Sequence, residues 1–523
     1  MESGAKKWII VATVVLCTLL ELIDTSIVNV ALTQMMGNMS ATLSEVSWVI
    51  AAYAIANVIV VPLTGFLSEQ FGRRNYFGFS VVLFTLASIA CGQSTNIWEL
   101  VAFRFIQGIG GGALMATSQS ILIDTFPPKQ LALGQALFGM GVIIGPTIGP
   151  TLGGYIVDNY DWPWIFYVNV PVGILATICT FLFIEDPERL RGAVPRPLRE
   201  LDWLGIILLI VGVGSLQFVL EKGETEDWFE SGLITTFTVF AVVGIVGFVW
   251  RELTASNPIV DLRVLTRSRN LALGAILSFV LGFGLFASVF IFPIFTQRIL
   301  GFTAAQTGLL LLPGALVSGF MMPMIGRAIQ AGVPQKYMLP LGFGIFFIFT
   351  FWMSQKISPT AGEDDFFWPL ILRGVGLGLL FLPVTTMSLQ GLRGKDGAQA
   401  AGLTGMLRQL GGSFGVAIVG TYVERSLAYN RVALLPNISL YDPETQQRLQ
   451  AFTQNFLSRG FSFDQAQRQA YQLLDLTLTK QASLITYAQT FTMLGLFFLA
   501  CIPLILFIKR VRNAGPVDLN AAH

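Results

Sequence analysis

Charged residues are scarce in this 523-residue sequence. Asp, Glu, Lys and Arg together account for 12% of it, whereas a soluble globular protein carries about 25%. Hydrophobic residues account for 54%, and apolar runs of about 20 residues, long enough to span a membrane, recur along the chain. The composition therefore argues against a string of soluble domains and predicts a polytopic, all-α integral membrane protein.

Cysteine and histidine are scarce as well. The four cysteines fall inside apolar runs at unrelated spacings, which argues against a disulfide framework or a cysteine-based metal site. The single histidine, His523, is the last residue, so neither histidine-dependent catalysis nor a metal site is expected. A net charge of +1 gives no basic field for nucleic acid. Because no Gly-x4-Gly-Lys-Ser/Thr phosphate loop is present, ATP should not drive the protein directly, and no cofactor is expected.

Fourteen apolar segments can be marked along the chain. An even number of spans places both termini on the same side of the membrane. The approximate bounds are 8–31, 46–67, 76–93, 97–123, 134–155, 164–184, 203–221, 232–251, 271–297, 305–326, 337–354, 366–390, 397–424 and 484–508.

The distribution of Lys and Arg sets the orientation. If the N-terminus is cytoplasmic, the segments facing the cytoplasm hold 20 basic residues and the opposite segments hold nine. Six of those nine lie in one long loop, 425–483, which the positive-inside rule discounts. We therefore expect both termini in the cytoplasm.

The first and last parts of the chain carry related sequences. At an offset of 266 residues, the matched residues are Ala132, Gly139, Gly145 and Gly149 with Ala398, Gly405, Gly411 and Gly415. Arg104 and Arg373 match at an offset of 269. Such repeats are typical of secondary transporters. We expect an N-terminal six-helix half over 1–190, a linker and two inserted helices over 191–268, and a C-terminal six-helix half over 269–523.

The loop 425–483 is the only sizeable region expected outside the membrane. Asp442-Pro443-Glu444 is a plausible helix start, and Ser462 with Gln465 forms a possible capping box. Two interpretations are open: a short helical cap over the outer mouth, or a docking element for a partner protein.

Three buried charges stand out in segments 8–31 and 97–123. Glu21 and Asp24 are three residues apart and share a helix face. Asp24 and Arg104 each lie about 10 Å inside the outer ends of their helices, so the two charges can meet at one depth. Since charges in a membrane are costly and carboxylates close to an arginine can have shifted pKa values, these residues are candidates for proton coupling. The alternative is a fixed structural ion pair.

Two glycine-containing motifs suggest moving parts. The loop between segments 46–67 and 76–93 combines small, acidic and basic residues that could pair at the cytoplasmic rim and act as a gate, although the arginines could equally be topological anchors. Segment 134–155 carries glycines at steps of four with prolines beside them, which favours a close, sliding helix contact over generic packing. The gating-loop candidates are Gly65, Glu69, Gly72, Arg73 and Arg74, and the segment 134–155 candidates are Gly141, Gly145, Pro146, Gly149, Pro150 and Gly153.

Polar and aromatic residues inside the apolar segments are candidates for the lining of a substrate cavity. The two further buried arginines could attract acidic amphipathic substrates or could lock their helices together. The candidates are Asn29, Tyr53, Asn57, Gln107, Phe286, Gln297, Arg373 and Arg408.

These motifs carry a family resemblance. The stretch 65–74 resembles the loop motif of the major facilitator superfamily, and 104–112 is similar to its helix-4 motif. The glycine-proline run 141–153 resembles the motif of its drug:proton antiporters, and the stretches around Asp24 and Asn169 resemble the fourteen-helix branch, EmrB-type multidrug exporters above all. The resemblance implies a major facilitator fold of two six-helix halves plus two inserted helices, and alternating access driven by proton entry. It also implies a periplasmic adaptor protein and an outer-membrane channel as partners.

The sequence thus predicts a proton-coupled multidrug efflux antiporter that exports lipophilic or amphipathic toxic compounds. A narrow-specificity exporter or importer of a single metabolite is the main alternative. A membrane-bound transferase is disfavoured, since neither a histidine motif nor a nucleophile–base pair is found. A sensor or scaffold would not require charges buried at matching depth.

Overall fold

Helices make up all the regular secondary structure of the computed structural model, which describes residues 4–127, 130–187, 201–392, 394–439 and 441–507. Thirteen helices in these ranges are long and apolar enough to cross a membrane. The remaining predicted span, 397–424, is part of the long helix α15 (Gly394–Leu434). The fourteen-helix fold class is confirmed.

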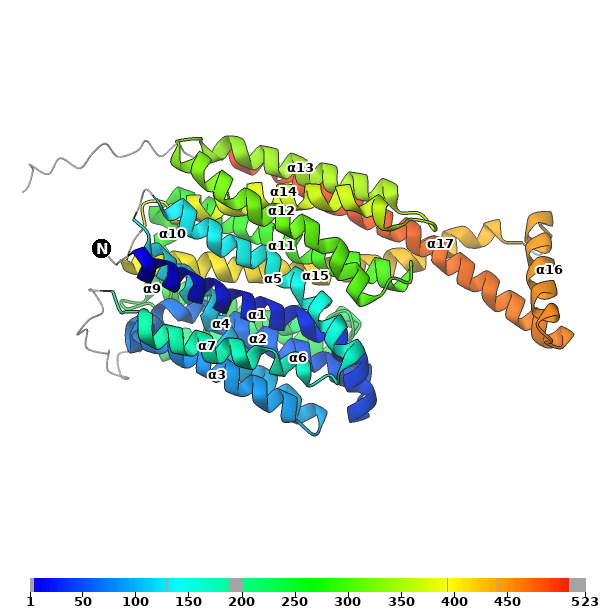
Figure 1. Ribbon diagram of the computed structural model, residues 1–523, viewed down its shortest axis with the longest axis horizontal. Coiled ribbons are helices and arrows are strands. Elements are labelled where there is room, and N and C mark those ends of the chain that lie inside the picture. The colour runs from blue at the N-terminus through cyan, green and yellow to red at the C-terminus, as the bar shows by residue number, and fades with distance from the viewer. Residues whose placement is uncertain (1–3, 128–129, 188–200, 393, 440, 508–523) are drawn as a thin grey trace, which may run out of the picture.

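The N-terminal half contains six spans (Figure 1). The predicted segment 164–184 consists of two consecutive helices, α6 and α7, which meet at Val168. The helices of this half are α1 (Gly4–Met39), α2 (Leu43–Phe71), α3 (Arg73–Gln93), α4 (Ile97–Thr125), α5 (Leu131–Asn159), α6 (Trp164–Tyr167) and α7 (Asn169–Phe183).

Two inserted spans and a second set of six complete the chain. The inserted helices are α8 (Trp203–Lys222) and α9 (Gly232–Thr254), followed by the short α10 (Arg263–Arg267). The C-terminal half contains α11 (Arg269–Arg298), α12 (Ala304–Gln330), α13 (Gln335–Lys356), α14 (Glu363–Leu389), α15, α16 (Pro443–Ser458) and α17 (Phe463–Ala500). The 3-10 turns are Trp228–Glu230, Leu435–Asn437 and Ile502–Phe507.

Local sequence signals fix where several helices begin and end. Thr42, Thr303 and Ser462 each accept a backbone hydrogen bond at a helix start and complete a capping box. Gly72 has φ +80°, a left-handed conformation that glycine adopts without strain. It is the single residue between α2 and α3, so the chain reverses there within one residue.

The helix pairings of the first half recur in the second. α1 packs on α5 as α11 packs on α15, and α2 packs on α4 as α12 packs on α14. The pair α3–α7 is matched in the same way by α13–α17. The internal sequence repeat is therefore also a structural repeat. The expected boundary at residues 190 and 191 lies outside the described residues.

The two halves meet along α5–α12 and α2–α15. At the end of the first contact where α12 begins, a methyl group added at Gly308 would lie 1.8 Å from the Thr151 hydroxyl oxygen. At the end where α12 finishes, one added at Gly326 would lie 3.3 Å from the Ala132 carbonyl oxygen. The α5–α12 contact is therefore closed at both ends in this conformation.

The inserted helices α8 and α9 bridge the two halves. From α8, Lys222 Nζ donates to the Ser44 carbonyl at the start of α2 (2.9 Å), and Gln217 Nε2 donates to Ser413 Oγ on α15 (2.8 Å). α9 packs on α8 and leaves many apolar side chains exposed, which suits a lipid-facing helix.

A carboxyl pair links this inserted unit to α15 near the outer surface. Burial and the neighbouring Glu424 carboxyl, with which Glu224 shares a hydrogen bond, raise the pKa of Glu224 from its ordinary 4.5 to about 7, while Arg298 opposes the shift. Between pH 4.5 and pH 7 the folded protein therefore binds more protons than the unfolded chain. Protonation of Glu224 thus contributes to the free energy of unfolding in full below pH 4.5, and this contribution is lost as the pH rises through 7.

We expect Glu224→Gln to flatten the pH dependence of thermal stability. A glutamine cannot ionise, so the fall in melting temperature between pH 5 and pH 8 should be smaller than in the wild type, as measured by scanning fluorimetry. The exposed Glu230→Gln is the matched control and should retain the wild-type slope. Equal slopes in all three proteins would contradict this role of the carboxyl pair.

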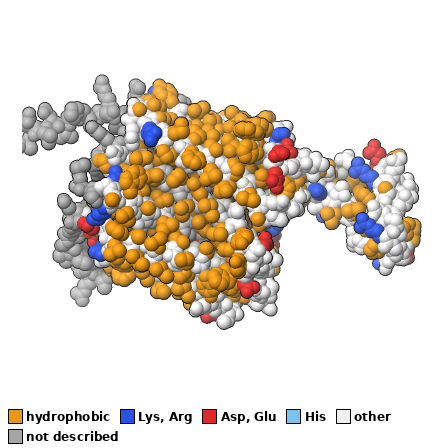
Figure 2. Space-filling model, in the orientation of Figure 1, with side chains coloured by type: hydrophobic (Ala, Val, Ile, Leu, Met, Phe, Trp, Pro, Cys, Tyr) orange, Lys and Arg blue, Asp and Glu red, His pale blue; other side chains and the backbone are white. Residues whose placement is uncertain are grey.

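The surface of the helical body is apolar around its middle. Figure 2 shows hydrophobic side chains covering the visible face of the body, while charged side chains gather at its two ends and on the projecting part of the chain. This distribution is expected of a body that sits in a lipid bilayer with its two ends in water.

The region 425–483 projects from the body instead of covering the outer mouth (Figure 1). α15 continues outward to Leu434, and α17 begins at Phe463 rather than near 484, with α16 across their ends. The expected short cap is therefore wrong, because both flanking helices extend beyond their apolar segments. The expected start of α16, with Asp442 as its N-cap, is confirmed. We call residues 425–483 the arm.

Candidate proton-coupling site

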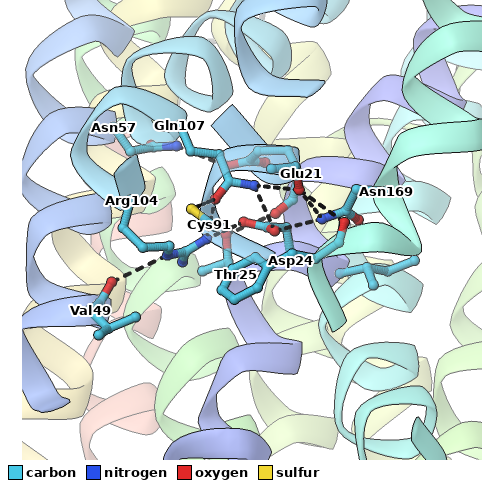
Figure 3. Close-up of polar contacts among 12 residues, drawn as sticks. Glu21, Asp24, Thr25, Val49, Asn57, Cys91, Arg104, Gln107 and Asn169 are labelled. Atoms are coloured by element: carbon cyan, nitrogen blue, oxygen red, sulfur yellow. Dashed lines mark hydrogen bonds and ion pairs between the residues drawn. The ribbon is translucent and has the colours of Figure 1, made fainter. Parts of the chain in front are cut away.

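Asp24 is fully buried on α1 and is surrounded by hydrogen-bond donors (Figure 3). Arg104 Nη1 on α4 donates to Asp24 Oδ2 at 2.6 Å. Gln107 Nε2 and Asn169 Nδ2 donate to Asp24 Oδ1 at 2.9 Å and 2.7 Å. Three donors from α4 and α7 thus satisfy the carboxylate, which is the condition for keeping a charge away from water.

A second layer holds the two amides in place. Ser88 Oγ on α3 accepts from Gln107 Nε2 and from Asn169 Nδ2, both at 3.1 Å, and donates to the Phe166 carbonyl at 3.0 Å. The orientation of both amides toward Asp24 is therefore fixed by α3. Neither Ser88 nor Asn169 was among the predicted coupling residues. Asn169 could have been found, since it lies in a stretch that carries the family resemblance, whereas nothing in the sequence marks Ser88.

Arg104 has partners on every side. It is 1% exposed, and besides Asp24 it donates to the Gln107 side-chain oxygen (2.7 Å) and to the Val49 carbonyl (3.3 Å). Its guanidinium lies over the Tyr53 ring, 4.2 Å from the centroid, a cation–π contact. The predicted meeting of Asp24 and Arg104 at one depth is confirmed, and titration of this pair stays a prediction.

Glu21 differs from Asp24 in its surroundings, although it lies one turn away on the same helix. It is 3% exposed, Asn57 Nδ2 donates to its Oε1 at 3.0 Å, and its Oε2 has no hydrogen-bond partner among the described residues. A buried carboxyl with one donor is better suited to carry a proton than one with three. In this conformation Asp24 has the contacts of a carboxylate, and Glu21 has those of a neutral acid.

Arg408 on α15 brings a charge of the second half toward these residues. It is 2% exposed, its Nη2 lies 3.7 Å from Met115 Sδ on α4, and its guanidinium is 5.2 Å from the Phe381 ring centroid. Its charge also acts on Glu21 across the contact between the halves. The electrostatic environment of Glu21 in the first half therefore depends on the position of the second half.

The gating loop is tied to the helices beside it. Arg73 Nη1 donates to Asp124 Oδ2 on α4, and the Arg74 backbone N–H donates to Asp186 just beyond α7. Both arginines thus have an acidic partner from a distant part of the sequence, which the sequence analysis did not identify, and gating by this loop stays a prediction. Glu69 is half-buried in the last turn of α2. A methyl group added at Gly65 would lie 3.7 Å from the backbone of Ala398 in the second half.

The glycines of α5 pack directly against the helix that carries Asp24. A methyl group at Gly145 would lie 2.7 Å from Leu22 Cβ, and one at Gly149 would lie 1.9 Å from Ser26 Oγ. Such contacts require glycine, whereas the nearest atom to a methyl group at Gly141 would be at 3.6 Å, which is ordinary contact. Gly153 faces Ile27 in the same way, and Pro146 and Pro150 lie inside the helix. α5 thus holds α1 on both sides of Asp24.

The predicted cavity residues fall into two groups. Tyr53, Asn57 and Gln107 are buried and belong to the charge network around Glu21 and Asp24. The others lie elsewhere. Asn29 is exposed on α1, and Gln297 is partly exposed near the end of α11. Phe286 packs against Gly412, and Arg373 Nε donates to Ser288 Oγ at 3.0 Å. Contact of any of them with a substrate stays a prediction.

Two repeated helical halves, with charges buried between their membrane-spanning helices, are the organisation of a secondary transporter. The chain belongs to the major facilitator superfamily, whose family model matches residues 14–416.

Full-length relatives and solved structures agree with this assignment. The chain is 34% identical to the "Multidrug export protein EmrB" of Escherichia coli (strain K12), covering 98% of this chain and 97% of that one. It is 33% identical to the "Fatty acid resistance protein FarB" of Neisseria gonorrhoeae, covering 98% of both. Among solved structures, the proton:xylose symporter XylE superposes with a TM-score of 0.59 at 14% identity, covering 96% of this chain and 97% of that chain. This likeness concerns the fold alone.

Proposed function

We propose that this protein is a proton-coupled multidrug efflux antiporter, which exports lipophilic or amphipathic toxic compounds by alternating access. The observation that carries the proposal is the buried Asp24–Arg104 pair with its amide donors. A charged, fully satisfied pair inside the membrane is costly to build and marks a functional site. Relatives over nearly the whole chain, one of them a multidrug export protein, support the export direction and the substrate class.

The proposed coupling uses two carboxyls in turn. In the present conformation Arg104 holds Asp24 as a carboxylate, while Glu21 can carry a proton on the oxygen that has no partner. When the halves move and Arg104 withdraws, Asp24 loses its counter-charge and takes up a proton from the outer side. Release toward the cytoplasm follows when the pair forms again. The energy comes from the proton gradient, so the mechanism requires neither a cofactor nor hydrolysis.

The moving contacts are those between the halves. The loop 65–74 closes the cytoplasmic end, since Gly65 lies against Ala398 while Arg73 is anchored to Asp124. Within the first half, the glycine face of α5 is the proposed pivot, because it lets α1 pack closely beside it. We propose that the substrate enters between the halves, where Asn29, Phe286, Gln297, Arg373 and Arg408 are the candidates to line its path.

The proposed cellular setting is the inner membrane of a bacterium, with both termini in the cytoplasm. The excess of Lys and Arg on the segments assigned to that side supports the orientation. The arm then projects into the periplasm, where a periplasmic adaptor protein and an outer-membrane channel are the proposed partners. Exposed apolar residues on the arm support a docking role: Tyr429, Val432, Tyr441, Phe461, Phe463, Tyr471 and Leu476.

Removal of the arm should separate transport from resistance. A short Gly-Ser linker from Leu434 to Tyr471 deletes α16 but keeps the base of the arm, where Arg431 pairs with Asp475 at 2.6 Å. The variant should keep proton-driven exchange in liposomes and lose the resistance that the wild type confers on cells, because only the latter needs a partner. Equal loss in both assays would contradict the docking role.

The proposed function is tested with purified protein in liposomes under an imposed proton gradient. Addition of lipophilic compounds of several chemical classes should evoke proton release in exchange for compound movement. Transport without proton flux would refute antiport. Exchange evoked by one compound only would favour a narrow-specificity exporter, and movement in the same direction as protons would favour an importer.

A further inference from the structure

The two halves differ at one pair of corresponding buried residues. In the first half, Arg104 on α4 donates to Asp24 on α1 at 2.6 Å. In the second half, Arg373 on α14 donates to Ser288 on α11 at 3.0 Å. The repeat matches α4 with α14 and α1 with α11. Ser288 therefore occupies the place of Asp24, and the second arginine has a hydroxyl where the first has a carboxylate.

Arg373 is left short of partners as a result. Its side chain is 2% exposed, its one hydrogen bond within the described residues is that to Ser288, and its Nη2 has no partner there. Ser288 offers only a neutral oxygen, since its hydroxyl donates its proton to the Leu285 carbonyl at 3.0 Å and carries no negative charge. Arg104, by contrast, has three side-chain or backbone acceptors and an aromatic ring. A buried guanidinium without an anion is unfavourable, which indicates a missing negative partner.

We propose that Arg373 is an anion-binding site in the second half, and that it takes the carboxylate or sulfonate head of an amphipathic substrate. The proposal rests on the export function proposed above and specifies one substrate class for it. The planar guanidinium offers parallel N–H groups that match the two oxygens of such a head. Phe292, one turn beyond Ser288 on α11, packs on Phe366 with ring centroids 5.7 Å apart and supplies an apolar wall for the tail.

The alternative is that Arg373 only joins α14 to α11. A joining residue would use its available donors on the protein, as Arg104 does, whereas Nη2 of Arg373 has no acceptor in the part of the chain that the structure describes. The pseudo-equivalent site also shows what a filled version looks like: Asp24 Oδ2 accepts from the arginine while Oδ1 accepts from neighbouring amides. An anionic head bound at Arg373 reproduces the first of these contacts with an oxygen that arrives from the substrate.

The test supplies the missing carboxylate from the protein. Ser288→Asp places an acid where the first half has Asp24, and Ser288→Asn is the matched control with the same shape and no charge. Purified variants in liposomes are given two probes below their micellar concentrations: decanesulfonate and decyltrimethylammonium, which share a tail and carry opposite permanent charges. We expect Ser288→Asp to bind and transport decanesulfonate at least about tenfold more weakly than Ser288→Asn, because the new carboxylate occupies Arg373. The two variants should handle decyltrimethylammonium equally.

Each other outcome is informative. If the two variants handle decanesulfonate equally, or if both probes are affected alike, Arg373 joins helices and the proposal is wrong. If Ser288→Asp fails to fold, Arg373→Lys decides the matter, since lysine keeps the charge but loses the paired N–H groups and should weaken binding of the sulfonate selectively. Wild-type protein that exchanges the cation for protons but never binds the sulfonate refutes the anion site alone. Failure to exchange either probe for protons refutes the proposed function itself.

Discussion

Asp24→Asn is expected to abolish proton-driven export, with a loss of about 100-fold, while the substrate still binds. The asparagine keeps the shape of the side chain but cannot take up or release a proton, and its amide nitrogen cannot accept a hydrogen bond as a carboxylate oxygen of Asp24 does. It also leaves the buried Arg104 without its counter-charge, which is unfavourable in itself. The measurement is substrate-evoked proton release from liposomes, alongside equilibrium binding to the detergent-purified variant.

Two further variants separate the lost proton from the unpaired charge. In the double variant Asp24→Asn with Arg104→Gln neither member of this buried pair is charged, so thermal stability should recover while coupling stays absent. Glu21→Gln removes a carboxyl that has a single donor, and we expect a partial loss of coupling with no loss of stability. Coupled transport in the triple variant, Asp24→Asn with Arg104→Gln and Glu21→Gln, would rule out this cluster as the proton pathway.

Gly149→Ala is expected to cost the protein both stability and transport. The added methyl group would lie 1.9 Å from Ser26 Oγ and 3.0 Å from the Ile23 carbonyl, so the hydroxyl has to turn and α1 has to move away from α5. Overpacking of this kind costs about 1–3 kcal/mol. Since Asp24 lies on the displaced stretch of α1, transport should fall by about tenfold or more. Thermal unfolding and liposome exchange measure the two effects.

Gly141→Ala is the matched control from the same motif. Its methyl group would meet Val15 at 3.6 Å, which is ordinary contact, and alanine is the better helix former. We expect wild-type or higher stability and transport close to that of the wild type. If the two alanine variants behave alike, the close approach of α5 to α1 has no special role, and the glycine pattern reflects helix packing in general.

The sequence was informative wherever a residue type is costly in its surroundings. Charges are rare in apolar segments, so Asp24 and Arg104 could be paired from their depth alone, and in the structure Arg104 Nη1 lies 2.6 Å from Asp24 Oδ2. The step of four between Gly145 and Gly149 likewise predicted a face without side chains. That face lies against α1 in the structure. Gly141 lies on the same face but is packed less tightly on α1, because spacing says which residues share a face and not how near the neighbouring helix comes.

Residues that act through long-range contacts could not be found from the sequence. Ser88 orients the two amides beside Asp24, and Asp124 and Asp186 hold the arginines of the gating loop, yet each is an ordinary residue in its own segment. The arm was misjudged for a related reason. Its helices are polar enough to read as a loop, since a helix that leaves the membrane no longer needs an apolar surface.

The sequence by itself determined the fold class, the internal repeat and the presence of charges that need partners, because the cost of polar groups in lipid acts residue by residue. Only the tertiary structure decided which partners those charges have. Packing brings α3, α4 and α7 around Asp24 and satisfies it, whereas among the described residues Arg373 donates one hydrogen bond, to Ser288. That difference arises from contacts between segments far apart in the chain, and no local pattern encodes such contacts.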